Sequence, residues 1–198
     1  MKLENKTVAI LASNGFEQSE LQGPLEALRK AGATVHIVSP ESGSIMGMKH
    51  ADKGDSFDVD VDLDSANAAD YDAIMLPGGL MNPDTLRTID TALAFVRAFA
   101  EAGKPIGAIC HAPWILIEAG LVKGRTLTSW PAIQSDVRNA GGHWVDEEVV
   151  CDQGLVTSRN PDDIPAFCKK LIEEIAEGRH QGMATATATS GDSSCCCS

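Results

Sequence analysis

The segment IGAICHAP, residues 106–113, carries the sequence pattern that is most informative about the fold. The four residues before Cys110 are an apolar run that predicts a buried strand, and a helix is expected to follow directly and to end near Gly120. Ala108 and Ala112 stand two positions from Cys110 on either side. Small neighbours of this kind are typical of a nucleophile elbow, in which a strand turns abruptly into a helix. The segment therefore predicts a strand–turn–helix unit with Cys110 at the turn.

The alternation of strand and helix continues on both sides of this segment. Short apolar runs predict further buried strands at residues 7–12, 34–38 and 71–76. Apolar residues with helical spacing predict helices at about 19–31, 84–102 and 164–177. Residues 58–64, DVDVDLD, alternate polar and apolar and predict an edge strand or exposed hairpin. This order predicts an α/β domain with a mainly parallel sheet covered by helices on both faces.

Length and charge restrict the function classes. The chain has 198 residues, which suggests one domain with or without a tail. Its 16 Lys and Arg residues against 28 Asp and Glu residues give a net charge of −12, which argues against nucleic acid or an anionic membrane as the main partner. The chain has no apolar run long enough to cross a membrane and no signal-peptide pattern at its start, so we expect a cytoplasmic protein.

The C-terminal segment differs from the rest in composition. Residues 1–181 are expected to form the domain, and residues 182–198 a low-complexity tail that cannot contribute to a core. The tail ends in Cys195, Cys196 and Cys197, for which lipidation, metal capture and oxidative crosslinking are weaker alternatives to an inert, disordered segment. No zinc-ligand spacing, dinucleotide fingerprint or phosphate-binding loop is present, so neither a metal nor a cofactor is predicted.

Three predicted turns should meet at the carboxyl ends of central strands. The first carries Glu17, the second is Pro77–Gly79, and the third contains Cys110 and His111. Ligands of open parallel sheets bind at this edge. A cysteine beside a helix start is favoured as the thiolate, which is the nucleophilic form. We therefore predict Cys110 as a nucleophile; the alternative is a buried cysteine at a strand end.

The other candidate residues each have a structural alternative. His111 is a candidate base or acid, but a lone histidine is more often a surface or capping residue. Glu17 beside a thiolate would be pushed toward its protonated form and could donate to sulfur, unless it is a surface glutamate. Asp84 could orient the imidazole or could cap a helix. The Gly78 and Gly79 N–H groups could form an oxyanion hole, although the pair by itself indicates only a turn.

With these residues assembled, the chain resembles the PfpI family of the parkinsonism-protein superfamily. The resemblance covers residues 5–178 and rests on several segments: NGFE at 14–17, LPGG at 76–79, AICHAPW at 108–114, LTSWP at 127–131, WVDEEVV at 144–150 and LVTSRNPDD at 155–163. Trp130 stands where related chains often have tyrosine, and Ala112 where many have glycine.

The resemblance implies a flavodoxin-like three-layer fold and a homo-oligomer, either a dimer or a hexamer. It implies that Cys110 is the nucleophile, Glu17 its hydrogen-bonding carboxyl and His111 the adjacent base. It also implies that Asp84 of a neighbouring subunit completes the site by orienting His111.

The activities implied by the resemblance leave alternatives open. We expect a cysteine-dependent, stress-protective enzyme of the hydrolase or lyase type that acts on glyoxals, or on early methylglyoxal or glyoxal adducts of proteins or nucleotides, and releases lactate or glycolate. An intracellular cysteine peptidase is the first alternative, and a non-enzymatic redox sensor or chaperone that uses oxidation of Cys110 is the second. A glutamine amidotransferase is excluded, because residues 158–162 lack the histidine which that class requires.

Overall fold

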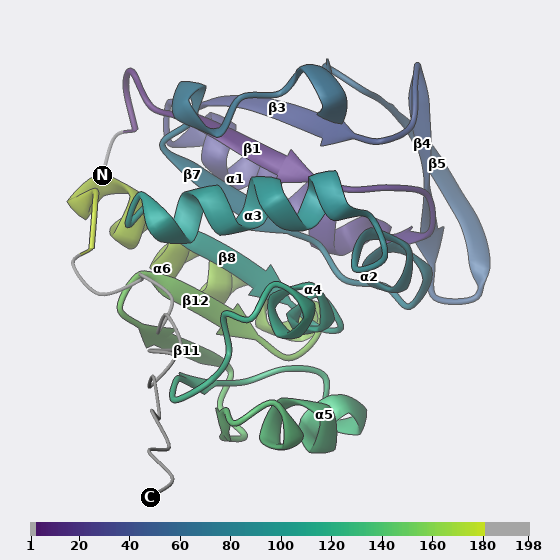
Figure 1. The fold of residues 1–198 in the computed structure, drawn as a ribbon. Helices are drawn as coiled ribbons and strands as arrows, with labels where there is room; N and C mark the ends of the chain where they lie inside the picture. The colour runs from purple at the N-terminus through teal and green to yellow at the C-terminus, as the bar shows by residue number, and fades with distance from the viewer. Residues whose placement is uncertain (1–2, 181–198) are drawn as a thin grey trace, which may run out of the picture.

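The computed structural model describes residues 3–180, which form three layers with a sheet between two layers of helices (Figure 1). The tail predicted from residue 182 onward lies outside the described residues. Among residues 3–180, no helix is both long enough and apolar enough to span a lipid bilayer.

The central sheet has seven strands in the order β11-β12-β8-β7-β1-β3-β6. All neighbouring strands are parallel except β11 and β12, which form an antiparallel edge. The strands are β1 (Thr7–Leu11), β3 (Thr34–Ser39), β6 (Val61–Asp62), β7 (Ala73–Leu76), β8 (Ile106–Ile109), β11 (Val149–Asp152) and β12 (Leu155–Ser158). The central strands β7 and β8 are buried along their whole length, as expected for strands covered on both faces.

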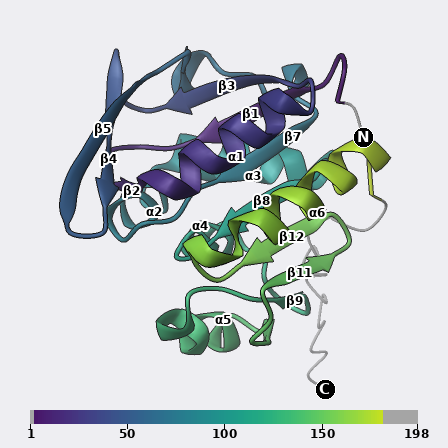
Figure 2. The same cartoon turned by 180° about the vertical axis from the view of Figure 1, so that it is seen from behind.

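Helices cover the two faces of the sheet in pairs. Figure 1 shows α3 (Asp90–Glu101) and α4 (Pro113–Glu118) on one face. Figure 2, from behind, shows α1 (Gln18–Lys30) and α6 (Ile164–Glu177) side by side on the other face. Each pair packs on its own apolar cluster, one of which includes Phe99 and Leu116 and the other Leu21 and Phe167. The predicted α/β class and flavodoxin-like layering are confirmed.

The remaining elements surround the carboxyl ends of the sheet or lie beside it. A three-stranded sheet is formed by β2 (Phe16–Glu17), β4 (Ser44–Lys49) and β5 (Asp52–Asp58). A two-stranded sheet is formed by β9 (Thr126–Leu127) and β10 (His143–Trp144), with α5 (Gln134–Asn139) between them in the chain. Short 3-10 turns occur at Leu63–Ser65, Ala68–Asp70, Pro131–Ile133 and Pro161–Asp163. Of the acidic run 58–64, only Val61–Asp62 pairs at the edge of the central sheet.

The helix predicted at 84–102 is instead two helices, α2 (Met81–Leu86) and α3. Helix α2 ends where both the N–H and the hydroxyl of Thr88 donate to the carbonyl of Thr85. A threonine side chain bonded in this way competes with the continuing helix. Ile89 then takes an extended conformation before α3 starts. Asp84 therefore lies inside α2, and the alternative that it caps a helix is wrong.

Candidate active site

Cys110 occupies a strained turn between β8 and α4. Its φ angle is 63°, a left-handed conformation that costs a non-glycine residue of order 1–3 kcal/mol. Two backbone hydrogen bonds hold it there: its N–H donates to Ser158 O at 3.0 Å, and its carbonyl accepts from Trp130 N–H at 2.8 Å. Cys110 as a whole is 6% exposed. This is the elbow geometry that the segment 106–113 predicts.

The Gly78–Gly79 turn lies against Cys110. Leu76 pairs with Ala108, so the turn after β7 runs beside the end of β8. A Cβ atom on Gly78 would lie 2.7 Å from the Cβ of Cys110 and 2.6 Å from Glu20 Oε2. Gly79 has a φ of 78°, and a Cβ there would lie 2.6 Å from the backbone nitrogen of Glu17. Both positions therefore require glycine, because the backbone approaches its neighbours too closely for any side chain.

The carboxyl group at the thiol belongs to Glu20. Glu20 is fully buried, and its Oε2 accepts a hydrogen bond from Gly78 N–H at 3.0 Å. Its side chain also hydrogen-bonds the Cys110 thiol. Its Oε1 is buried and is bonded to no nitrogen or oxygen of the described residues. Burial raises the pKa of Glu20 to about 8, so this carboxyl can carry a proton near neutral pH.

Thiol and carboxyl are electrostatically coupled. Burial raises the pKa of Cys110 above its usual range, and the negative charge of Glu20 raises it further. The backbone N–H groups of Gly79 and His111 donate toward the sulfur and lower the pKa in part. The position of the cysteine near a helix start is thus not enough to produce a thiolate. A thiolate forms here when the proton that the pair shares lies on Glu20.

Glu17 is placed differently from its predicted position. Its Oε2 accepts from the backbone N–H of His50 at 3.0 Å, and its Oε1 accepts from the hydroxyl of Ser19 at 3.2 Å. Because α1 begins at Gln18, Glu20 rather than Glu17 turns inward toward β8. The prediction that Glu17 hydrogen-bonds the thiol is therefore corrected to Glu20. Glu17 still acts on the pair at longer range, since its charge contributes to the raised pKa of Glu20.

His111 lies beside the sulfur between two tryptophans. Its Nδ1 is 3.2 Å from Sγ of Cys110. The imidazole stacks on Trp130, with ring centres 5.8 Å apart and planes at 25°, and its ring centre lies 5.2 Å from that of Trp114. Burial lowers the pKa of His111, which keeps the imidazole neutral and able to accept a proton at neutral pH.

Asp84 does not reach His111 within one chain. Its side chain is 59% exposed and pairs with Arg87, whose Nε lies 3.0 Å from Asp84 Oδ1. The guanidinium of Arg87 lies 4.7 Å from the ring centre of Trp114, which contacts His111 in turn. Asp84 makes no hydrogen bond to His111 among residues 3–180. The structure brings together Cys110, His111, Gly78 and Gly79, and leaves Asp84 at the outer edge.

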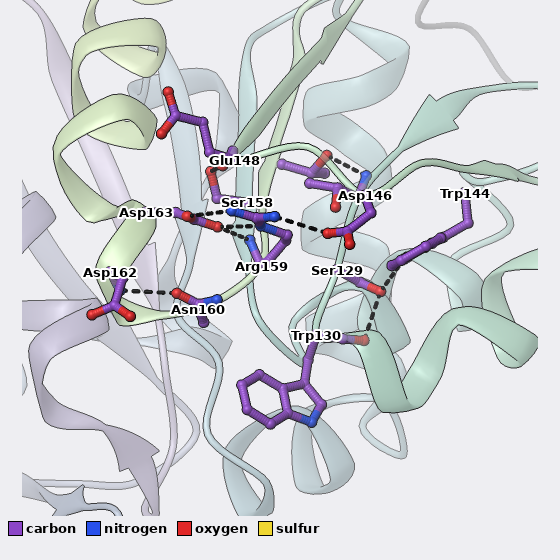
Figure 3. A network of polar contacts seen from close by, with 12 residues as sticks. Ser129, Trp130, Trp144, Asp146, Glu148, Ser158, Arg159, Asn160, Asp162 and Asp163 are labelled. Atoms are coloured by element: carbon purple, nitrogen blue, oxygen red, sulfur yellow. Dashed lines mark hydrogen bonds and ion pairs between the residues drawn. The ribbon is translucent and has the colours of Figure 1, made fainter.

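A polar network supports the loop that holds Cys110 (Figure 3). Ser158, which accepts the N–H of Cys110, donates its hydroxyl to Glu148 O at 2.6 Å. The next residue, Arg159, donates from Nε to Asp163 at 2.9 Å and from Nη1 to Asp146 at 2.8 Å. The buried carboxylate of Asp163 thus ties the end of β12 to the start of α6. These residues position the elbow from outside the site.

The indole N–H of Trp144 extends this network on the other side. It donates to the Ser129 hydroxyl at 2.9 Å, and that hydroxyl donates to Trp130 O at 3.1 Å (Figure 3). Trp130 both holds the carbonyl of Cys110 and stacks on His111. Its orientation therefore affects both reactive side chains.

Comparison with known proteins agrees with this geometry. The sequence profile described as the DJ-1/PfpI family matches residues 6–174. The chain belongs to the DJ-1/PfpI family.

Relatives of this DJ-1/PfpI protein support the assignment along nearly the whole domain. The Escherichia coli protein named Protein/nucleic acid deglycase 2 is 41% identical over 169 residues, which cover 85% of this chain and 96% of the relative. General stress protein 18 of Bacillus subtilis is 41% identical over 168 residues, covering 84% and 96%. Among solved structures, Drosophila melanogaster DJ-1beta is 27% identical with a TM-score of 0.77, covering 89% and 95%.

Glu20 is the site residue that the sequence analysis missed. A signal for it was present: Glu20, Pro24 and Leu28 recur at four-residue spacing, and all three are buried on one face of α1. A carboxyl group on the apolar stripe of a helix is costly unless a partner or a function compensates for it. The presence of a carboxyl group on this apolar face therefore indicates a functional role for Glu20, and not for Glu17, in this DJ-1/PfpI chain.

Proposed function

We propose that this protein is a cysteine-dependent enzyme that removes glyoxal-derived damage, acting on early methylglyoxal or glyoxal adducts or on the free glyoxals. The observation that carries the proposal is the thiol of Cys110 on a strained elbow, bonded to a buried carboxyl whose pKa lies near 8. Two relatives with names of deglycase and stress protein, each 41% identical, support it.

The first step uses the shared proton. Sγ of Cys110 attacks the aldehyde carbon, the C=O electron pair moves to oxygen, and that oxygen takes the proton from Glu20. With an amine adduct, a C–S bond replaces the C–N bond and the departing amine takes the proton. Both routes give the same hemithioacetal. The N–H groups of Gly79 and His111, which already point at the sulfur, are candidate donors to the new oxygen. The N–H of Gly78, predicted as a donor, instead donates to Glu20 Oε2.

The second step moves hydrogen within the bound fragment. Ionised Glu20 removes the proton from the carbon bonded to sulfur, and an enediolate forms as the electrons shift to the oxygen of the adjacent carbonyl. That oxygen then takes the proton of the neighbouring hydroxyl. Return of the proton to the neighbouring carbon leaves a thioester of a hydroxy acid. Water, deprotonated by the neutral imidazole of His111, then hydrolyses the thioester, which releases lactate or glycolate and restores the thiol. No oxidant is consumed.

We infer a homo-oligomer in which another subunit covers the outer edge of the site. Leu80 and Met81 at the start of α2 are 61% and 58% exposed, and Trp130 beside His111 is 38% exposed. Exposed large apolar side chains near a site are typical of an interface. A partner placed there could bring its own Asp84 to His111. We also propose a cytoplasmic location, because a reducing compartment keeps the free thiol of Cys110 reduced.

The product assay distinguishes the proposed activity from the main alternative. Purified, fully reduced protein is expected to release lactate from methylglyoxal or from a methylglyoxal-treated amino acid, and glycolate from the corresponding glyoxal adduct. A cysteine peptidase is the second candidate, favoured by the 3.2 Å contact between His111 Nδ1 and the thiol. Cleavage of a fluorogenic peptide without any hydroxy-acid release would replace our proposal. Reversible oxidation of Cys110 without either turnover would favour the redox sensor.

A mixing experiment tests whether Asp84 acts in the neighbouring subunit. We expect Asp84→Asn and Cys110→Ser to be nearly inactive alone. In a refolded equal mixture of the two, half of the dimers would be mixed, and each mixed dimer would have one intact site. About a quarter of the wild-type activity should then return. No recovery in verified mixed oligomers would mean that Asp84 acts within its own chain, through Arg87 and Trp114.

A further inference from the structure

We propose a second site, for a divalent transition-metal ion of the zinc type, formed by Glu174, Glu177 and His180 at the C-terminal end of α6. One donor atom from each of these residues lies within 4.8 Å of the other two. Imidazole nitrogen and carboxylate oxygen are zinc ligands, and three such ligands with a water give the usual tetrahedral shell.

The distance between two of the donor atoms already suits a metal ion. Glu174 Oε2 and His180 Nε2 are 3.3 Å apart. Zinc with bonds of about 2.0–2.1 Å to both atoms in a tetrahedral shell would hold them about 3.3–3.4 Å apart. Glu177 is exposed, so its side chain is free to rotate toward the other two ligands.

His180 Nε2 is the observation that points to a ligand. This nitrogen is buried, although the side chain is 18% exposed, and has no hydrogen bond of acceptable geometry among residues 3–180. Its 3.3 Å contact with Glu174 Oε2 is an ion pair only when the imidazole is protonated. A buried ring nitrogen without a hydrogen-bond partner is costly, and coordination of a metal ion would satisfy it. The nitrogen faces the same carboxylate oxygen that the proposed ion would use.

The histidine is held in place by backbone contacts from two other segments. Its N–H donates to Gly103 O at 2.7 Å, ahead of β8. Its ring packs on Gly154, in the turn between β11 and β12, where a Cβ atom would lie 2.6 Å from the ring. Gly178, with a φ of 94°, ends α6 and turns the chain so that His180 returns beside Glu174. A rigidly placed ring is what a binding site requires.

Glu174 is supported as a ligand by residues outside the proposed shell. Its Oε1, the oxygen away from His180, accepts from Lys170 Nζ at 2.9 Å. It is also hydrogen-bonded to the thiol of Cys151. Hydrogen bonds of this kind orient metal ligands, and the bond from Lys170 to Oε1 leaves Oε2 on the side of His180.

The proposed site lies at the amino ends of the strands of the central sheet, whereas Cys110 lies at their carboxyl ends. Gly103 precedes β8 and Gly154 precedes β12, whereas Cys110 follows β8. Figure 2 shows the C-terminal end of α6 at the amino ends of these strands. An ion there would tie α6 to the starts of two strands and would stabilise the fold, so this inference is independent of the proposed reaction.

The test is calorimetric titration of the chelator-treated, reduced full-length chain with zinc chloride. Tail cysteines could bind zinc themselves, so the background carries Cys195→Ser, Cys196→Ser and Cys197→Ser. We expect one zinc per chain at this site, a Kd at least about tenfold higher in Glu177→Gln and in His180→Gln, and no change beyond twofold in the control Glu173→Gln. Glu173 is on the same helix but outside the proposed shell.

Thermal unfolding of the same variants gives a second measurement. Zinc at about 100 times its Kd should raise Tm by at least about 4 °C in the background protein and in Glu173→Gln, but not in Glu177→Gln. Turnover by Cys110 should be the same in all of them, which also shows that they fold. Zinc affinity unchanged in both ligand variants, or no binding tighter than about 0.1 mM, would overturn the proposal.

Discussion

Cys110→Ser is expected to lower hydroxy-acid release from methylglyoxal adducts by at least about 10³-fold. The loss is expected because serine is a much weaker nucleophile than cysteine at this position. A serine at this elbow keeps the geometry and the backbone bonds to Ser158 and Trp130, but its hydroxyl is far harder to deprotonate than a thiol. With the buried carboxyl of Glu20 beside it, serine has no route to an alkoxide. The measurement is the rate of lactate formation, with the thiol content of each protein determined beforehand.

Cys151→Ser is the matched control for this variant. Cys151 lies on β11, half-buried, and its pKa is raised to about 11 by burial and by the neighbouring Glu174. A serine there can still donate a hydrogen bond to Glu174, so the fold and turnover should be kept. If Cys110→Ser retained a tenth or more of the activity while Cys151→Ser lost it, the nucleophile would have been assigned to the wrong cysteine.

The part of the site that could be predicted from the sequence is the part encoded in short local patterns. The run before Cys110 and its small neighbours define an elbow, and the registers of β7 and β8 bring Gly78 and Gly79 to it. Local patterning also predicted a mainly parallel α/β sheet covered by helices on both faces, but not the order of its strands. These features depend on backbone requirements that only a few residue types satisfy.

What could not be predicted depends on packing between segments far apart in the chain. Glu17 and Glu20 both follow β1, and only the exact start of α1 determines which of them turns inward. The break between α2 and α3 has a similar cause, since one hydroxyl bond from Thr88 ends a helix that the apolar spacing would continue. Helix boundaries shift by a residue or two, and such a shift changes which side chain reaches the site.

Glu20→Gln is expected to lower turnover by about 10²–10⁴-fold, the contribution of a positioned proton-transfer group. Glutamine can still accept from Gly78 N–H, so the turn should remain in place. It cannot give a proton to the new oxygen or remove one from carbon. Glu17→Gln is the matched control: its one amide oxygen can still accept from His50 N–H, its NH2 group can donate to the Ser19 hydroxyl, and turnover should stay within about threefold.

The pH profile gives a second, independent readout of Glu20. The reactive form of the wild-type pair carries one proton, on the carboxyl, with the thiolate beside it. The pKa of Glu20 is raised to about 8 and that of Cys110 lies higher still, so the pair holds two protons below about pH 8. kcat/KM should therefore rise as the pH rises through that value and the pair reaches its one-proton form. In Glu20→Gln the rise near pH 8 should be absent from the residual activity, because the amide does not titrate.

Alkylation separates proton transfer from activation of the thiol. The charge of Glu20 raises the pKa of Cys110, so its removal should leave the reaction of Cys110 with iodoacetamide at pH 7 equally fast or faster. Turnover would then fall while the nucleophile stays competent. If alkylation instead slowed in proportion to turnover, Glu20 would act by stabilising the thiolate, and the proton transfers to and from the substrate would have to come from His111.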